Sequence, residues 1–472
     1  MVADHSQKSA IRNPQSAIQR SFDRVITAGL MIAIAFTALA LGAVEAWSVA
    51  VFEVIVVILL LLWAAKTVVD RRLEINFPVV TLPLGAFVLI GVIQSVAITG
   101  SAGQVHSLSM DFEATRGAAV VIFFLFVCFI IAANFFETPK RLRGLANFLI
   151  IFGLVLAVFA LIQHFTWEGK LFWARPTKAA GAGTGGPFVN RNHFAGYMEM
   201  LIPIPVVLAL SRRTRFEARL FYGFAAGVMG VAEVASLSRG GMISLFAALL
   251  FVAAITASKK DRSRSQRHSS FVPGPVYFIA LMLIAIIVGV FWVGADFEIL
   301  KRIADDSLSS TSPMGRAGIW RDTWAMFCAH PIFGVGLGAF ETVYPIYGRG
   351  NGSLLIQFAH NDYLQILADA GIIGGALAVW FITMLARALV KIFRHEDAMS
   401  RAIQLGCAAG IFALLIHSLF DFNLQIPSNA LLFLILSAVV STSMVSANEQ
   451  TERGSRTRIK ERGQQQQLEI KD

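Results

Sequence analysis

A polar segment with the residue types needed for group transfer interrupts a strongly apolar sequence. Within residues 313–374 it gathers arginine, histidine, asparagine and aspartate side chains: Arg316, Arg321, His330, Arg349, His360, Asn361 and Asp362. Arginine stays charged and grips phosphate through parallel hydrogen bonds, and a neutral histidine accepts a proton near pH 7. Membrane proteins keep this many polar groups together only where water or a polar ligand meets them. We therefore interpret this segment as the reaction site.

His360 and Asn361 stand directly before a predicted helix. Asp362 and Gln365 have the spacing of a capping box, so we expect Asp362 to be the helix N-cap. A helix N-terminus attracts anions, and a histidine beside it is suited to accept a proton. We interpret His360 as a candidate general base, and an idle loop histidine is the alternative.

Basic residues at two other places are interpreted as anion-binding groups. The loop 166–192 is basic and glycine-rich, and it ends in FVNRNHFAGY, where Asn192 follows Arg191. Arg239 lies in the SLSRGG turn between two apolar runs, where glycines expose backbone amides to a phosphate. The alternatives are a solvated loop near lipid headgroups for Arg191 and an arginine reaching the interface for Arg239.

Two acidic patterns leave alternatives open. Asp111 and Glu113 form a DxE pair, and a second pair occupies 296–298. Such pairs can hold a divalent metal but are common by chance, so we predict no metal and no cofactor. Asp421 lies four residues after His417, on the same face of a predicted helix. We interpret that pair as a brace for the site, with a proton relay as the alternative.

The elements that position these residues are predicted to be membrane-spanning helices. The chain has 472 residues, of which 56% are hydrophobic and only 15% charged. Its apolar residues fall into twelve runs of about the length that crosses a bilayer. The runs are 25–43, 47–65, 79–98, 117–136, 145–165, 193–210, 218–236, 241–257, 275–294, 371–390, 402–420 and 429–446. We therefore predict an all-α integral membrane protein with about twelve transmembrane helices.

The distribution of basic residues predicts the orientation. With both termini in the cytoplasm, 29 of the 40 Lys and Arg residues fall on the cytoplasmic side, as the positive-inside rule requires. The net charge of +10 is explained in this way, so it indicates no nucleic-acid partner. Residues 1–447 then form a polytopic membrane domain, residues 448–472 form a polar cytoplasmic tail, and the reaction site faces outward.

The predicted outer loop 295–362 is long enough that we expect it to contain secondary structure of its own. Apolar residues at helical spacing predict a helix over 315–329, lying in the interface with its tryptophans at headgroup depth. The GVGLG stretch that follows, at 334–338, has no strand before it, so we interpret it as a flexible turn and not as a nucleotide-binding loop.

Several of these motifs occur together in one known family. The blocks GRAGIWRDTW, HPIFGVGLGAF and AHNDYLQILADAGIIGG resemble the O-antigen ligase and Wzy-type polymerase superfamily. FVNRNHFAGY, SLSRGG and DFNLQIPSN are similar to flanking motifs of its members, so that the resemblance covers residues 185–430.

The resemblance implies a GT-C-like glycosyltransferase in the bacterial inner membrane. It implies transfer of a glycan from undecaprenyl diphosphate to a glycan or lipid acceptor on the periplasmic side, with inversion and without a metal. The family's histidine falls on His360, and its diphosphate-binding arginines fall on Arg239 and Arg316, with Arg191 as a further candidate. We add a supporting group of four residues: Asn192, Arg321, Asn361 and Asp421.

Two questions stay open at this point. A transporter or flippase for lipid-linked oligosaccharides also suits twelve spans, but it should carry its charged residues near mid-membrane. Within the family, the sequence leaves the acceptor open between lipid A core, a growing polysaccharide and a protein hydroxyl, and with it the choice between ligase and polymerase.

Overall fold

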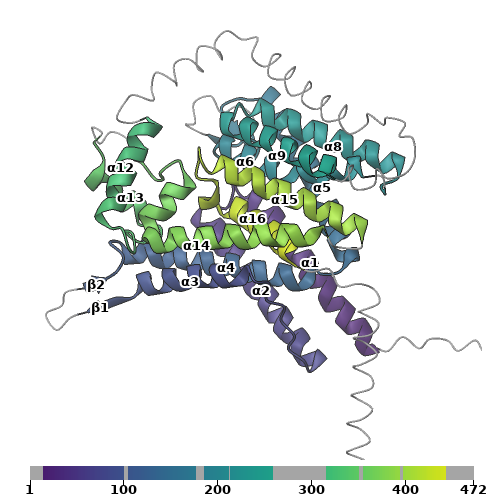
Figure 1. Ribbon diagram of the computed structural model, residues 1–472, viewed down its shortest axis with the longest axis horizontal. Helices are drawn as coiled ribbons and strands as arrows, with labels where there is room; N and C mark the ends of the chain where they lie inside the picture. The colour runs from purple at the N-terminus through teal and green to yellow at the C-terminus, as the bar shows by residue number, and fades with distance from the viewer. Residues whose placement is uncertain are drawn as a thin grey trace, which may run out of the picture.

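The computed structural model describes residues 14–99, 105–176, 185–211, 213–258, 315–349, 355–393 and 397–442. Helices dominate these ranges (Figure 1). The strands described form two short antiparallel hairpins, one of β1 (Ala97–Thr99) with β2 (Val105–Ser107) and one of β3 (Lys170–Leu171) with β4 (Arg175–Pro176). The predicted all-α fold class is confirmed.

Nine helical stretches of the described ranges are long and apolar enough to cross a membrane. They are α1 (Pro14–Leu39), α2 (Ala46–Asp70), α4 (Phe112–Phe135), α5 (Pro139–Phe165), the pair α6 (Arg191–Leu201) and α7 (Pro203–Leu210), α8 (Phe216–Ala235), α9 (Arg239–Ser258), α14 (Asp362–Ile392) and α15 (Ala398–His417). The apolar helices α3 (Thr81–Ser95) and α16 (Pro427–Ser441) are shorter. The protein is thus a multi-helix membrane protein, and its total of twelve spans stays a prediction because the run 275–294 lies outside the described residues.

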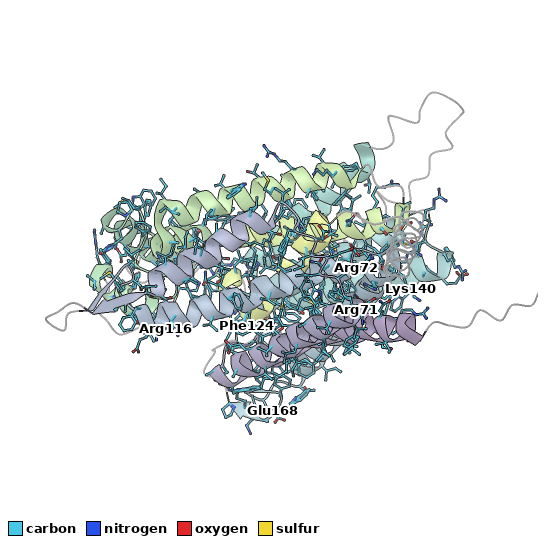
Figure 2. All side chains as sticks on the ribbon, turned by 90° about the horizontal axis from the view of Figure 1, so that it is seen from below. Arg71, Arg72, Arg116, Phe124, Lys140 and Glu168 are labelled. Carbon is cyan, nitrogen blue, oxygen red and sulfur yellow. The ribbon has the colours of Figure 1, made fainter. Side chains whose placement is uncertain are left out.

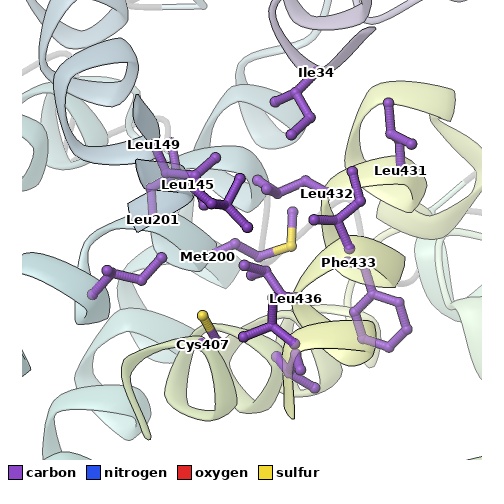
Figure 3. Packing of buried hydrophobic residues seen from close by; sticks show 14 of the residues in the cluster. Ile34, Leu145, Leu149, Met200, Leu201, Cys407, Leu431, Leu432, Phe433 and Leu436 are labelled. Atoms are coloured by element: carbon purple, nitrogen blue, oxygen red, sulfur yellow. The ribbon is translucent and has the colours of Figure 1, made fainter. Parts of the chain in front are cut away.

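The α6–α7 pair occupies the centre of the helical bundle, and 94% of its span is buried. Pro203 interrupts it, because a proline nitrogen has no hydrogen to donate to the preceding turn. Figure 3 shows Met200 and Leu201 packed with residues of α16 in the same apolar cluster. Helix α15 approaches α6 so closely that a Cβ at Gly410 would lie 2.2 Å from the carbonyl oxygen of Met200. Small residues allow membrane helices this close approach.

Two short helices form a separate unit at one end of the bundle (Figure 1). Helix α12 (Arg316–Ala329) and helix α13 (Phe340–Tyr347) pack around a small apolar core of their own, which includes Met326 and Phe340. The predicted helix at 315–329 is therefore present. Trp324 on its surface is half exposed, as expected for a residue at headgroup depth.

The GVGLG turn after α12, at 334–338, packs against a break in helix α14. Gly371 has φ 62° and ψ −160°, a backbone conformation that side chains disfavour, and it divides α14 into a short first segment and a long second one. The carbonyl groups of Ala368 and Asp369, which the break leaves without helical partners, accept hydrogen bonds from the backbone N–H groups of Val335 and Gly336 at 2.8 and 3.0 Å. The GVGLG stretch thus caps a broken helix.

The opposite end of the bundle carries basic residues. Lys66 at the end of α2 lies 3.7 Å from Asp23 of α1. Figure 2 shows Arg71 and Lys140 near that end and Arg116 toward the other end. The start of α1 therefore lies beside the end of α2, and the side of the membrane that each end of the bundle faces stays a prediction.

We predict that Gly410→Ala destabilises the protein, because the added methyl group would overlap the Met200 carbonyl. Overpacking of this kind costs about 1–3 kcal/mol. Gly117→Ala is the matched control, since a Cβ at Gly117 meets nothing within 4 Å. Thermal unfolding in detergent should show a lower midpoint for Gly410→Ala and an equal or higher midpoint for Gly117→Ala. Equal midpoints for Gly410→Ala and wild type would contradict the described packing.

Candidate active site

A fully buried carboxylate forms the centre of the candidate site. Asp421 lies in the turn after α15, and its side chain has no exposed surface. Its Oδ2 accepts a hydrogen bond from Nδ2 of Asn192 at 2.5 Å, and its Oδ1 accepts one from the backbone N–H of Phe422 at 2.9 Å. Nδ1 of His360 lies 3.4 Å from Oδ1, and Nη2 of Arg316 lies 3.7 Å from Oδ2.

Four residues predicted from sequence thus meet, although they come from different parts of the chain. Asn192 is in the first turn of α6, Arg316 begins α12, His360 precedes α14 and Asp421 follows α15. Burial raises the pKa of Asp421, but the contact with His360 and the influence of the nearby histidines outweigh burial and leave the pKa well below its ordinary value. Asp421 is therefore a carboxylate anion across the physiological pH range.

His360 is held in an uncommon backbone conformation. Its φ is 51°, in the left-handed region that costs a non-glycine residue on the order of 1–3 kcal/mol. Nε1 of Trp320 donates a hydrogen bond to its carbonyl oxygen at 3.3 Å, and the Phe422 ring packs against the imidazole edge to face at 4.8 Å. Nδ1 is buried and faces Oδ1 of Asp421 at 3.4 Å, a contact that falls short of hydrogen-bond geometry. Because 32% of the side chain is exposed, the exposed part lies on the side of the ring away from that nitrogen.

Trp320 and Phe422 were missed in the sequence analysis. Each lies inside a motif that was recognised, Trp320 in GRAGIWRDTW and Phe422 in DFNLQIPSN. Aromatic residues are so common in this chain that their positions alone carried no signal.

Asn361, not Asp362, is the N-cap of α14, so the prediction for Asp362 was wrong. The Asn361 side-chain oxygen accepts hydrogen bonds at 3.0 Å from the backbone N–H groups of Tyr363 and Leu364. Its backbone is extended, as a cap residue requires, and Asp362 is already the first helical residue. The Asn361 side chain also donates to the carbonyl of Leu419, in the turn that carries Asp421.

Arg239 and Arg191 both lie at the site's end of the bundle. Arg239 is exposed at the start of α9, and Arg191 is partly buried at the start of α6. The residue after Arg239 is Gly240, at which a Cβ would come within 2.6 Å of Nε2 of His417. The SRGG turn therefore packs against the end of α15, four residues before Asp421.

Arg321 belongs to a second cluster and not to the one around Asp421. It contacts Asp322, which is 1% exposed in its side chain, with Nη2 3.0 Å from Oδ1. Nε of Arg349 lies 3.8 Å from the same oxygen, and the Tyr344 hydroxyl donates to Oδ2 at 3.5 Å. Burial and the neighbouring Asp322 raise the pKa of Tyr344 to about 12. Asp322 was missed, and only its position beside Arg321 could have indicated it.

The predicted pairing of His417 with Asp421 was wrong. Helix α15 ends at His417, but the backbone N–H of Asp421 still donates to the His417 carbonyl at 3.1 Å, so the two residues stay one helical turn apart and it is their side chains that have other partners. Nδ1 of His417 instead lies 3.1 Å from Oε2 of Glu199 on α6, and both side chains are buried.

Asp111 of the first DxE pair has structural partners. Its carboxylate caps α4 by accepting from the backbone N–H of Ala114 at 3.0 Å, and it accepts from the Thr342 hydroxyl at 2.9 Å. The bond to Ala114 and then the bond to Thr342 lower the pKa of Asp111. Within the ranges that the structure describes, no three His, Cys, Asp or Glu side chains are arranged to hold a metal ion. The second DxE pair, at 296–298, lies outside the described residues.

Comparison with protein families gives one match. Residues 224–379 match the family model described as O-antigen ligase. The match confirms the resemblance to the O-antigen ligase and Wzy-type polymerase superfamily and includes five of the predicted site residues: Arg239, Arg316, Arg321, His360 and Asn361. Arg191, Asn192 and Asp421 lie outside it. None of the curated proteins matches the chain.

We predict that Asp421→Asn lowers stability by about 1–3 kcal/mol, because an amide cannot accept all the hydrogen bonds that the buried Asp421 carboxylate accepts and Arg316 loses its charged partner. The pKa of Asp421 is lower in the folded protein than the unfolded value of about 3.9. Its stabilising effect is therefore complete above that value and is lost only as the pH falls toward the folded pKa.

Thermal unfolding of both proteins from about pH 8 to about pH 5 measures this effect. The difference between the two midpoints should not shrink over that range. A difference that closes between these limits would show that Asp421 is not held as an anion.

Proposed function

We propose that the protein is a glycosyltransferase that moves a glycan from undecaprenyl diphosphate to an acceptor hydroxyl. The family match supports an O-antigen ligase or polymerase type of function in general. The observation that carries the specific proposal is the imidazole of His360, placed against a buried anion and beside Arg316. We further propose that the site faces the periplasm from the bacterial inner membrane.

In this mechanism His360 is the general base. When Nδ1–H faces the carboxylate of Asp421, the lone pair for accepting a proton is on Nε2, on the more exposed side of the ring. Nε2 takes the proton of the acceptor hydroxyl while that oxygen attacks the anomeric carbon of the donor sugar. The bond from that carbon to the diphosphate oxygen breaks, so the configuration inverts. Asp421 stabilises the imidazolium that forms.

Arginines stabilise the departing diphosphate. The Arg316 side chain is 48% exposed and touches Asp421 only at 3.7 Å, so its guanidinium has hydrogen-bonding capacity for a ligand. Arg239, exposed at the start of α9, is the second diphosphate ligand, and Arg191 at the start of α6 is the third. Charge placed where negative charge develops lowers the barrier, and no metal is needed for the account.

The orientation follows from charge. The bundle end opposite the site carries the basic residues that the sequence assigns to the cytoplasm, among them Arg71 and Lys140 (Figure 2). The positive-inside rule then favours a periplasmic site.

The transporter alternative is less well supported. The groups around Asp421 lie at helix ends and in turns at one end of the bundle, whereas a transporter holds its substrate near mid-membrane between broken helices. The break described above, at Gly371 of α14, is occupied by the backbone of Val335 and Gly336. Together with the family match, the location at the bundle end favours transfer chemistry.

His360→Ala should reduce turnover about 10²- to 10⁴-fold, the usual effect of removing a positioned general base. The purified protein in detergent would be assayed for release of undecaprenyl diphosphate from its lipid-linked glycan. Binding of undecaprenyl diphosphate should be unchanged because the arginines remain. His330→Ala is the matched control, since His330 lies in the same unit but contacts Tyr347.

Carrier binding separates two roles for His360. If His360 is the general base, binding of undecaprenyl diphosphate by His360→Ala should equal that of wild type. If His360 instead binds the diphosphate, His360→Ala should weaken carrier binding. Wild-type turnover in His360→Ala would reject both roles.

Cys328 tests the orientation, because it is exposed on α12 while Cys128 and Cys407 are buried. A membrane-impermeant thiol reagent added to intact spheroplasts should label wild type and should not label Cys328→Ser. Labelling that requires permeabilised membranes would place α12 on the cytoplasmic side and contradict a periplasmic site.

A further inference from the structure

The segment that carries His360 is hydrogen-bonded to the end of α15 and to the turn that follows it. The Tyr363 hydroxyl donates to the Leu415 carbonyl at 2.7 Å, and Asn361 Nδ2 donates to the Leu419 carbonyl at 3.1 Å. Both bonds reach residues that precede Asp421. One further side chain contacts the turn both before and after Asp421.

That side chain is Asp362, which is 1% exposed. Its backbone N–H donates to the Ser418 carbonyl at 2.9 Å. Its Oδ2 accepts from the Ser418 hydroxyl at 2.8 Å and from the backbone N–H of Leu424 at 3.1 Å. A single carboxylate oxygen thus closes the turn 418–424, at whose middle Asp421 lies.

We propose that Asp362 is a positioning residue that sets the distance between Asp421 and His360. The inference rests on the proposed function of that pair. Asp362 touches neither the imidazole nor the Asp421 carboxylate by a hydrogen bond, so it acts through the backbone of the turn. Without it, Asp421 would keep its charge but lose its fixed place behind the ring, and Nε2 would no longer be held toward the acceptor hydroxyl.

Asp362 holds the turn through the hydrogen bonds that its side chain accepts and not through a negative charge. Both bonds to its side chain arrive at Oδ2, and Oδ1 has no partner. A second negative charge beside Asp421 is itself unfavourable. Asparagine has the same shape and presents one carbonyl oxygen, so it reproduces both accepted hydrogen bonds. Asp362→Asn should therefore preserve the arrangement, whereas Asp362→Ala should remove it.

The test compares turnover with carrier binding for purified variants of the full chain. Asp362→Ala should lower kcat about 10- to 100-fold, the effect of misplacing a reacting group by about 1 Å. Binding of undecaprenyl diphosphate should stay within about twofold of wild type. Asp362→Asn should recover most of the lost kcat. Ser418→Ala, which removes one of the two bonds and is a milder change if Asp362→Ala does not fold, should lower kcat by a smaller factor.

Asp369 provides a matched control on the same segment of α14. It is also buried, accepts a hydrogen bond at Oδ2 from Gln365 and has an unpartnered Oδ1, but it faces the helix break and not the turn. Asp369→Ala should retain kcat per folded molecule. An equal loss of kcat in both alanine variants, or no recovery in Asp362→Asn, would overturn the positioning role.

The outcome for His360 separates this inference from the proposed function. If His360→Ala keeps its turnover, the general-base mechanism itself fails. If His360→Ala loses turnover while Asp362→Ala and Ser418→Ala keep theirs, the mechanism stands and the role of Asp362 is rejected.

Discussion

The architecture of the site depends on one buried negative charge. An ionised carboxylate without contact to water is costly unless positive groups and hydrogen-bond donors surround it. Asp421 meets that requirement with an amide from α6, a backbone N–H of its own turn, an imidazole from the loop before α14 and a guanidinium from α12. Four separate elements must therefore reach one point, and their arrangement is the site.

The rest of the fold keeps those elements in place. The close contact of α15 with α6 at Gly410 fixes the helix that leads into the turn of Asp421. The break at Gly371 lets α14 begin with a short segment at the end of the bundle, where the α12–α13 unit covers it. The left-handed conformation of His360 turns its ring toward the carboxylate. This strain is tolerated because Asn361 caps the helix after it and Trp320 binds its carbonyl.

Local patterns predicted much of the fold and the identity of most site residues. Apolar run length predicted the described spans, and helical spacing predicted α12, because both signals depend on neighbouring residues alone. His360 and Arg316 were selected because they belong to the polar segment 313–374 and match the motifs of the resembled family. Asn192 and Asp421 were added as supporting residues from the flanking motifs, without knowledge of what they contact.

The pairings themselves were not predictable from local spacing. Asp421 was assigned to His417 because they are four residues apart, but the His417 side chain contacts Glu199, and Asp421 faces His360, 61 positions earlier in the chain. Asp362 was assigned as a cap because its spacing to Gln365 fits, yet Asn361 takes that role and leaves Asp362 to face the turn. Arg321 was placed with the site because it belongs to the same polar segment, 313–374. Its helix position instead directs it to Asp322.

The central claim is that Asp421 acts in catalysis through His360, and a double-mutant cycle on kcat tests it most directly. His360→Ala, Asp421→Ala and the double variant would be compared with wild type in the same detergent. The account predicts that the double variant is no slower than His360→Ala alone, within about threefold, because residues that act as a unit are not additive. Losses that multiply in the double variant would show that the two side chains act independently and would contradict the account.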